Sequence, residues 1–392
     1  MSLSKPAYLA TADGLFFVGR ACGAEGQAGG ELCFNTSMSG YQEIVTDPSY
    51  GGQIITMTAP QMGNYGVCDE DSQSRGVFAR GLVVREMCHE PSNWRSQGSL
   101  PDYLRAQGVV AIEGIDTRAI VRHLRDRGAV NAVISTECSD RETLLAAARA
   151  EPGLVGRDLA ATVACDRPYD FLEGVRGGQQ SDLWSESCPY VSPVSSQDDT
   201  ETPTARFRVV AFDTGIKYDI LRNLRSCGCS VHVVPPTTSA EDVLAQHPDG
   251  IFLANGPGDP DAVDYLCRTV RQLIGRRPLF GICLGHQILS LAAGAKTYKL
   301  KFGHRGGNHP VMYLPTGRVE ITAQNHGFAV DLDGTRDIEL THLNLNDQTV
   351  EGIRLRTAPA FSVQYHPEAA PGPHDAHYVF TEFTRLMEEY TQ

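Results

Sequence analysis

One cysteine of this chain has a sequence setting that suits a nucleophile. The stretch RPLFGICLGHQILSLAAG (277–294) runs from an apolar strand through Gly281-Ile282-Cys283-Leu284-Gly285 directly into a helical pattern. A sharp strand-to-helix turn flanked by small residues holds a nucleophile in a strained conformation. The helix N-terminus would favour the thiolate of Cys283, and the next backbone N–H could donate to an oxyanion. Taken alone, the motif fits a buried structural cysteine about as well.

A nucleophilic thiol needs a base, and the base needs a group that orients it. The stretch FSVQYHPEAA (361–370) is an apolar strand that ends in His366-Pro367-Glu368. Strand ends on one edge of a parallel sheet converge on the crevice where ligands bind. We therefore expect His366 to approach Cys283, with Glu368 holding its imidazole tautomer.

A third stretch, ANGPGDP (254–260), ends another strand in a Gly/Pro turn. Gly256 and Gly258 would let the backbone approach a ligand closely and expose N–H groups to it. Without its context, this stretch favours an ordinary tight turn.

The elements around these stretches predict an α/β fold. Strand-like runs at 207–212, 230–235, 249–255 and 277–282 alternate with helical patterns, which is typical of β-α-β units and a mostly parallel sheet. The N-terminal part has short strands, many glycines and a helical pair, and predicts a smaller α+β domain. Residues 166–206 are rich in Ser, Pro, Gly and Asp and indicate a linker. We thus expect an N-terminal domain over 1–165, which docks a partner and contacts the second domain, and an α/β domain over 207–392.

Composition excludes several classes of function. Lys and Arg number 34 against 47 Asp and Glu, a net charge of −13, which argues against a nucleic-acid or anionic-membrane partner. No apolar run approaches the length of a membrane span, and the first residues lack the apolar core of a secretory signal. Eleven cysteines without a disulfide-scaffold spacing favour the cytoplasm.

Together NGPGDP, GICLGHQ and YHPE, in this order and spacing, resemble the class I (triad) glutamine amidotransferases. Further stretches resemble carbamoyl-phosphate synthase small chains, and the resemblance covers almost the whole chain. They are KFGHRGGNHPV (301–311), ITAQNHGFAV (321–330), AAPGPHDA (369–376), FNTSMSGYQEIVTDPSYGGQII (34–55), MGNYGV (62–67) and GIDTRAIVRHLRDRGA (114–129). The N-terminal matches are the specific ones, because amidotransferase domains in general lack such a domain.

The resemblance implies that Cys283 attacks the side-chain amide of glutamine, forms a γ-glutamyl thioester and releases ammonia. It makes His366 the general base and acid and Glu368 its partner. It also assigns glutamine-binding positions. Two of them, Leu284 and Gly258, would supply the backbone N–H groups of the oxyanion hole. The others are Ser49, Gly256, Gln287, Asn325, Gly327 and Phe328.

The resemblance also implies an obligate partner. The chain has no Walker A lysine motif and no dinucleotide fingerprint. We expect no cofactor on this chain, and ATP and Mg on a large chain that makes carbamoyl phosphate for arginine and pyrimidine biosynthesis. Two alternatives are a stand-alone thiol hydrolase of γ-glutamyl compounds, which would not need the N-terminal domain, and a non-catalytic scaffold, which would not need an intact triad.

Four histidines raise the question of a metal. They are His304, His309, His374 and His377, and no clear cysteine or carboxylate set completes a site with them. We expect no metal, and expect these side chains to bond to loops near the glutamine site or to face the partner.

Overall fold

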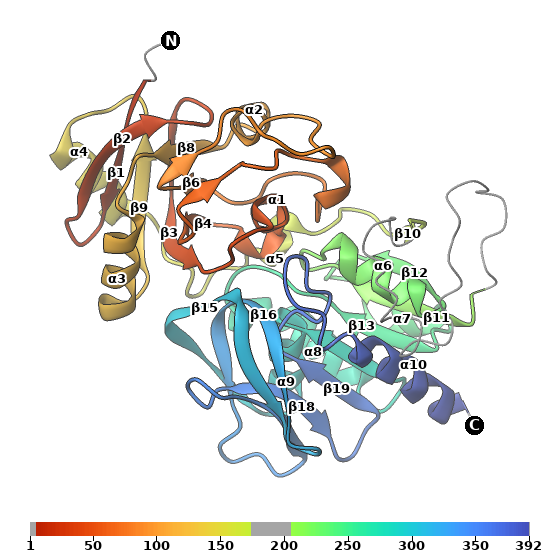
Figure 1. Cartoon of the computed structure of the whole chain (residues 1–392). Helices are drawn as coiled ribbons and strands as arrows, with labels where there is room; N and C mark the ends of the chain where they lie inside the picture. Colours follow the sequence, from red (N-terminus) through yellow and green to blue (C-terminus); the bar gives the residue numbers. More distant parts are fainter. Residues whose placement is uncertain (1–4, 174–204, 392) are drawn as a thin grey trace.

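The N-terminal half of the chain closes into a β-barrel (Figure 1). The structure, a computed structural model, describes residues 5–173 and 205–391. Around the barrel the strands follow in the order β1 (Pro6–Thr11), β2 (Phe16–Ala21), β8 (Val110–Glu113), β6 (Gly81–Val83), β4 (Gln53–Met57), β3 (Gln27–Asn35) and β9 (Val130–Ser135). A separate pair consists of β5 (Gln61–Met62) and β7 (Glu86–Met87).

Apolar side chains of the barrel strands form a dense core. Leu9, Leu32, Ile54 and Ile112 are fully buried in one cluster, and the helix α3 adds Ile120 to it. The helices of this half are α1 (Tyr41–Thr46), α2 (Leu100–Ala106), α3 (Thr117–Arg127), α4 (Arg141–Ala150) and α5 (Ala160–Val163). This half therefore combines a barrel of mixed parallel and antiparallel strands with short helices, in agreement with a small N-terminal domain that contains both.

The C-terminal half is built on one sheet with a parallel centre. Its strands lie in the order β10 (Tyr169–Phe171), β12 (Cys229–Val234), β11 (Phe207–Phe212), β13 (Gly250–Leu253), β14 (Leu279–Ile282), β19 (Ala360–Val363), β18 (Val350–Leu355), β17 (Ile338–Asn344), β15 (Lys296–Tyr313) and β16 (Arg318–Asp331). The strands from β12 to β19 in this order pair in parallel, and those that flank them are antiparallel. This arrangement confirms the predicted α/β fold.

Helices cover both faces of this sheet. On one face, α6 (Tyr218–Ser226) and α10 (Tyr378–Thr391) pack in one apolar cluster with Val209 and Ala211 of β11. On the other face, α7 (Ala240–Ala245), α8 (Asp264–Leu273) and α9 (Leu284–Ala292) pack with Val210 and Phe212 of the same strand. Successive residues of β11 thus enter different cores, which explains its uninterrupted apolar sequence.

The connection between the halves differs from the predicted linker. Strand β10 lies within 166–206, yet it pairs antiparallel with β12 at the edge of the C-terminal sheet. Ala160 of α5 also packs in the α8–α9 cluster. The chain therefore packs against the C-terminal half from α5 onward and joins its sheet at β10, within the first residues of the predicted linker. Residues 174–204 of that prediction lie outside the described residues.

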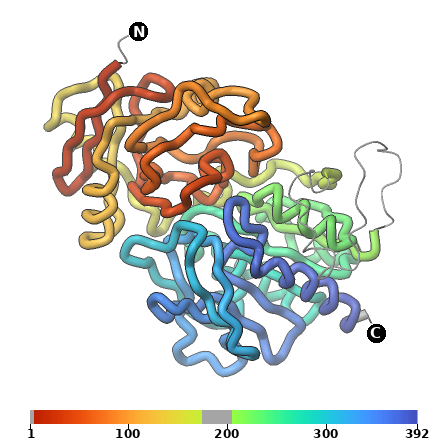
Figure 2. The backbone as a smooth tube through the Cα atoms, viewed as in Figure 1, coloured from red at the N-terminus to blue at the C-terminus, as the bar shows by residue number. Residues whose placement is uncertain are grey.

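The two halves lie against each other along the sheet's antiparallel end (Figure 2). The backbone N–H of Ala129 donates to the carbonyl of Lys301 at 2.8 Å, and that of Thr36 donates to the carbonyl of Arg305 at 3.2 Å. Within the residues described, no helix is long and apolar enough to cross a membrane.

Candidate active site

Cys283 lies at a strained turn between β14 and α9. Its backbone has φ 54° and ψ −104°, in the region that L-residues other than glycine rarely adopt. Glycine is needed at positions 281 and 285 because there is no room for a side chain. A Cβ at Gly281 would lie 2.7 Å from the carbonyl carbon of Gly285, and a Cβ at Gly285 would lie 2.1 Å from the oxygen of Leu253. The turn therefore has the geometry of a nucleophile elbow.

His366 reaches this turn from the end of β19, the strand next to β14. Its Nδ1 lies 2.7 Å from Oε1 of Glu368, and its backbone N–H donates to the carbonyl of Ala323 at 2.8 Å. The Cys283 thiol interacts with the same imidazole, and its Sγ lies 3.6 Å from the carbonyl oxygen of Asn325. The three residues predicted as a catalytic triad are thus together and buried.

The charges around His366 favour the imidazolium. Burial acts to lower the pKa of His366, but the Glu368 carboxylate and then the Cys283 thiol outweigh it and raise the pKa to about 10. Burial likewise acts to raise the pKa of Glu368, yet Lys217 and then His366 hold it well below its usual value. At neutral pH the imidazole therefore carries a proton that it can donate.

Lys217 is a member of this site that sequence reasoning missed. It immediately precedes α6, and its Nζ donates to Oε1 of Glu368 at 2.8 Å and to the carbonyl of Ala370 at 2.7 Å. Burial acts to lower the pKa of Lys217, but Glu368 raises it above its ordinary value. Lys217, Glu368, His366 and Cys283 therefore form one buried line of interacting groups.

A pocket opens beside the thiol of Cys283. It brings together the predicted glutamine-binding residues except Leu284, which lies buried at the first position of α9. Its lining consists of Ser49, Gln53, Leu154, Gly256, Pro257, Gly258, Cys283, Gln287, Asn325, His326, Gly327 and Phe328. The backbone N–H of Leu284, at a helix start, has no acceptor within the helix and suits an oxyanion. We call this the glutamine-side pocket.

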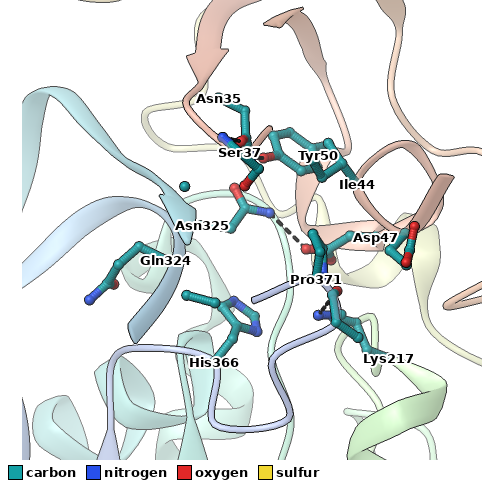
Figure 3. A pocket seen from close by; sticks show the side chains of 14 residues that line it. Asn35, Ser37, Ile44, Asp47, Tyr50, Lys217, Gln324, Asn325, His366 and Pro371 are labelled. Carbon is teal, nitrogen blue, oxygen red and sulfur yellow. Dashed lines mark hydrogen bonds between the residues drawn. The ribbon is translucent and has the colours of Figure 1, made fainter. Parts of the chain in front are cut away.

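The N-terminal domain supplies one wall of that pocket. The 3₁₀ helix η1 (Pro48–Tyr50) brings Ser49 to the site, where Nδ2 of Asn255 donates to its Oγ at 2.9 Å. Asp47 caps η1 and also accepts from Nδ2 of Asn325 at 2.8 Å (Figure 3). Asp47 and Asn255 were not assigned from the sequence, although both lie in stretches that carry the resemblance.

A second pocket, here named the inner pocket, is lined by His366 and shares Asn325 with the glutamine-side pocket. Figure 3 shows His366, Lys217 and Asn325 facing it together with Asp47 and Pro371. Its cavity volume of about 20 Å³ is room for about one water-sized molecule. The remaining lining residues are Asn35, Ser37, Glu43, Ile44, Tyr50, Gly306, Ala323, Gln324 and Ala370.

Next to the site, a cluster of two histidines and a glutamate brings three atoms together that could bind a metal ion. His304, His326 and Glu351 place such atoms within 4.8 Å of one another. Protein groups already bond them: Nε2 of His304 lies 2.8 Å from Asp347, and Nδ1 of His326 lies 2.8 Å from the carbonyl of Phe328. Burial acts to lower the pKa of His304, but Asp347 and Glu351 raise it to about 9. The charged imidazolium that results would repel a cation.

The other histidines considered for a metal lie apart from a complete ligand set among the described residues. His374 and His377 face each other, with Nδ1 of the first 3.0 Å from Nε2 of the second. The ring of His309 lies 5.2 Å from that of His304. The expectation of no metal stays a prediction.

Comparison with known proteins gives the family. Residues 9–134 match the model "Carbamoyl-phosphate synthase small chain, CPSase domain", and residues 209–386 match "Glutamine amidotransferase class-I". The chain is 54% identical over 389 residues to a carbamoyl phosphate synthase small chain of Syntrophotalea carbinolica, covering 98% of this chain and 99% of the relative. It is 52% identical to the small chain of Rhodopirellula baltica, covering 99% and 98%.

These matches extend over both halves of the chain and confirm the resemblance found in the sequence. The chain belongs to the carbamoyl-phosphate synthase small-chain family, whose C-terminal half is a class-I glutamine amidotransferase domain, and it is the glutamine-hydrolysing component of that enzyme.

Proposed function

We propose that the chain hydrolyses L-glutamine through a thioester on Cys283. The thiolate attacks the side-chain amide carbon, and the oxyanion that develops accepts from the backbone N–H groups of Leu284 and Gly258. His366 donates its proton to the leaving nitrogen, the C–N bond breaks, and ammonia departs. Water then attacks the thioester, His366 takes its proton, and glutamate leaves as the C–S bond breaks.

Glu368 and Lys217 act on this sequence through His366. The 2.7 Å contact of Glu368 with Nδ1 fixes the tautomer, so that the other imidazole nitrogen is the one that exchanges the proton. The positive charge of Lys217 balances the negative charge of the Glu368 carboxylate, and both side chains are buried away from water. Both are therefore positioning residues, and neither transfers a proton to the substrate.

The glutamine-side pocket supports the choice of substrate. Ser49 and the amide groups of Gln287 and Asn325 offer donors and acceptors to an α-amino acid, and the backbone of Gly327 and Phe328 adds further ones. Nε2 of Gln287 donates to the carbonyl of Phe328 at 2.9 Å, which links two of these elements before glutamine arrives. Such convergent polar groups fix the orientation of a small ligand.

We further propose that the ammonia passes to a larger partner chain. On that chain ATP and Mg would activate bicarbonate, and carbamoyl phosphate would form for arginine and pyrimidine biosynthesis. The inner pocket supports this step, because it borders His366 and has room for a molecule the size of ammonia. We expect the pair to act in the cytoplasm, and the ten free cysteines among the described residues fit that compartment.

The observation that carries the proposal is the buried contact of Cys283, His366 and Glu368 beside the glutamine-side pocket. The test is Cys283→Ala in the complex with the large chain. We expect glutamine-dependent carbamoyl phosphate synthesis to disappear and synthesis from ammonium salt to remain. If the variant also lost the ammonia-dependent reaction, Cys283 would be structural for the partner. If the wild-type chain hydrolysed glutamine at full rate alone and no ATP-using partner altered that rate, the stand-alone hydrolase would be favoured.

A further inference from the structure

A glutamine of the N-terminal half lines the glutamine-side pocket, although it is not among the residues predicted to bind the substrate. Gln53 is the first residue of β4, and its side chain is buried. Its Nε2 donates to the carbonyl of Ser49 at 3.1 Å, which fixes the direction of the side-chain amide. The amide group of Gln53 therefore lies next to η1, the segment that forms one wall of the pocket, and its Oε1 is an acceptor.

This Oε1 is a buried acceptor without a donor. Among the described residues that line the pocket, Gln53 is the only one with a buried side-chain oxygen or nitrogen that has no hydrogen-bond partner. Buried polar groups normally have a partner, because an unpaired one is costly. An oxygen in the wall of a ligand pocket can obtain its donor from the ligand.

The α-ammonium group of glutamine is the donor that fits. No Asp or Glu is among the described residues that line the pocket, so a cation bound there must be held by neutral acceptors. Asp47 lines the inner pocket instead, and its two oxygens already accept from the backbone N–H of Ser49 and from Nδ2 of Asn325. The side-chain amide of the substrate must lie at the Cys283 thiol to be attacked. The α-ammonium group is then the donor left for Gln53.

The position of Ser49 supports this assignment. Its Oγ accepts from Nδ2 of Asn255 at 2.9 Å, so the hydroxyl hydrogen remains to donate to the α-carboxylate of the substrate. The carboxylate and ammonium groups of an amino acid are attached to the same carbon, and the residues that bind them must therefore be neighbours. Ser49 and the amide of Gln53 are neighbours, because a hydrogen bond joins them.

Resting on the proposed function, we propose that Gln53 makes the site specific for an α-amino acid by accepting from the α-ammonium group of L-glutamine. A substrate with this group completes the hydrogen bonding of Oε1, whereas the same compound without it leaves the oxygen buried and unpaired. The α-ammonium group is remote from the reacting carbon. The contact is therefore equally strong in the ground state and the transition state, and its loss raises KM rather than lowering kcat.

The test compares L-glutamine with glutaramate, which is glutamine without its amino group, in wild type and in Gln53→Leu. Each full-length variant is assayed in the complex with the large chain for kcat and KM of glutamine hydrolysis and for the inhibition constant of glutaramate. We expect Gln53→Leu to raise KM for L-glutamine by about 10- to 100-fold, the effect of losing one hydrogen bond to a charged group. Its kcat and its inhibition constant for glutaramate should stay close to those of wild type.

Gln42→Leu is the matched control. Gln42 is also buried in the N-terminal half and lines neither pocket, and its Oε1 already accepts from the backbone N–H of Cys68 at 2.8 Å. This variant should keep the wild-type ratio of KM to the inhibition constant, whatever its stability. A second variant, Gln53→Glu, keeps an acceptor oxygen but loses the donor to the Ser49 carbonyl, and it should retain the preference for L-glutamine.

Equal rises of KM and of the inhibition constant in Gln53→Leu would overturn the proposal. They would show that Gln53 acts by positioning Ser49, whose contact with the carboxylate both compounds share. An unchanged KM would also overturn it, as would a loss of preference in Gln53→Glu as large as that in Gln53→Leu. A wild-type complex that did not hydrolyse L-glutamine at all would instead refute the proposed function.

Discussion

Replacing Lys217 by methionine should lower the free energy of unfolding of the C-terminal domain by more than the loss of one surface charge would. Lys217 and Glu368 have side chains that are 4% and 0% exposed, and the substitution removes both hydrogen bonds of Nζ. The Glu368 carboxylate would stay buried with His366 as its remaining charged partner. Removing one member of a buried ion pair costs about 3–5 kcal/mol. With an m-value of about 2 kcal/mol/M, the urea midpoint should fall by roughly 1.5–2.5 M.

The assay is urea unfolding followed by circular dichroism, with Arg268→Met as control. Arg268 lies 2.6 Å from Asp264, but these side chains are 62% and 63% exposed, so the loss should be below about 1 kcal/mol. In a Glu368→Gln background, Lys217→Met should cost much less, because a neutral amide needs no counter-charge. Equal midpoints for the Lys217 and Arg268 variants, or an undiminished cost in that background, would refute the reasoning.

Three further outcomes are expected. A thiol-directed glutamine analogue should label Cys283 before any other cysteine, as read by peptide mass spectrometry, and comparable labelling of several cysteines would count against the elbow. His366→Ala should lower glutaminase kcat by about 100- to 10,000-fold, and Glu368→Ala by less, since it transfers no proton; equal losses in steady-state assays would break that order. Because the pKa of His366 is raised from 6.5 to about 10, its stabilising contribution is complete below pH 6.5 and is lost as the pH rises through 10. The urea midpoint of wild type should therefore fall more between pH 7 and 10 than that of His366→Gln, and parallel curves would contradict the pairing.

The chemistry of the elbow could be predicted from the sequence because it depends on local constraints. A nucleophile between a buried strand and a helix requires small neighbours, and Gly281 and Gly285 can be read directly from the sequence. The parallel sheet followed equally from alternating strand and helix patterns. His366 could be connected with Cys283 because both follow strands that end at the same sheet edge.

Other features depend on contacts that no local pattern encodes. A lysine before a helix, such as Lys217, normally lies in solvent, and only the fold buries it against Glu368. Ser49 was assigned by resemblance alone, since it reaches the site through the docking of the two halves. Strand β10 lies in a polar segment, where pairing with the edge of an existing sheet outweighs weak propensity.

The insertion of η1 into the C-terminal site also bears on biosynthesis. A ribosome makes the chain from its N-terminus, so Ser49 emerges before Cys283, and Cys283 before His366. The barrel residues are made before those of the sheet, and the pocket lacks Cys283 and then His366 until β19 has been made. A nascent or prematurely terminated chain would therefore contain Ser49 of the glutamine-side pocket without Cys283 or His366. Aborted translation products would then not release ammonia from glutamine.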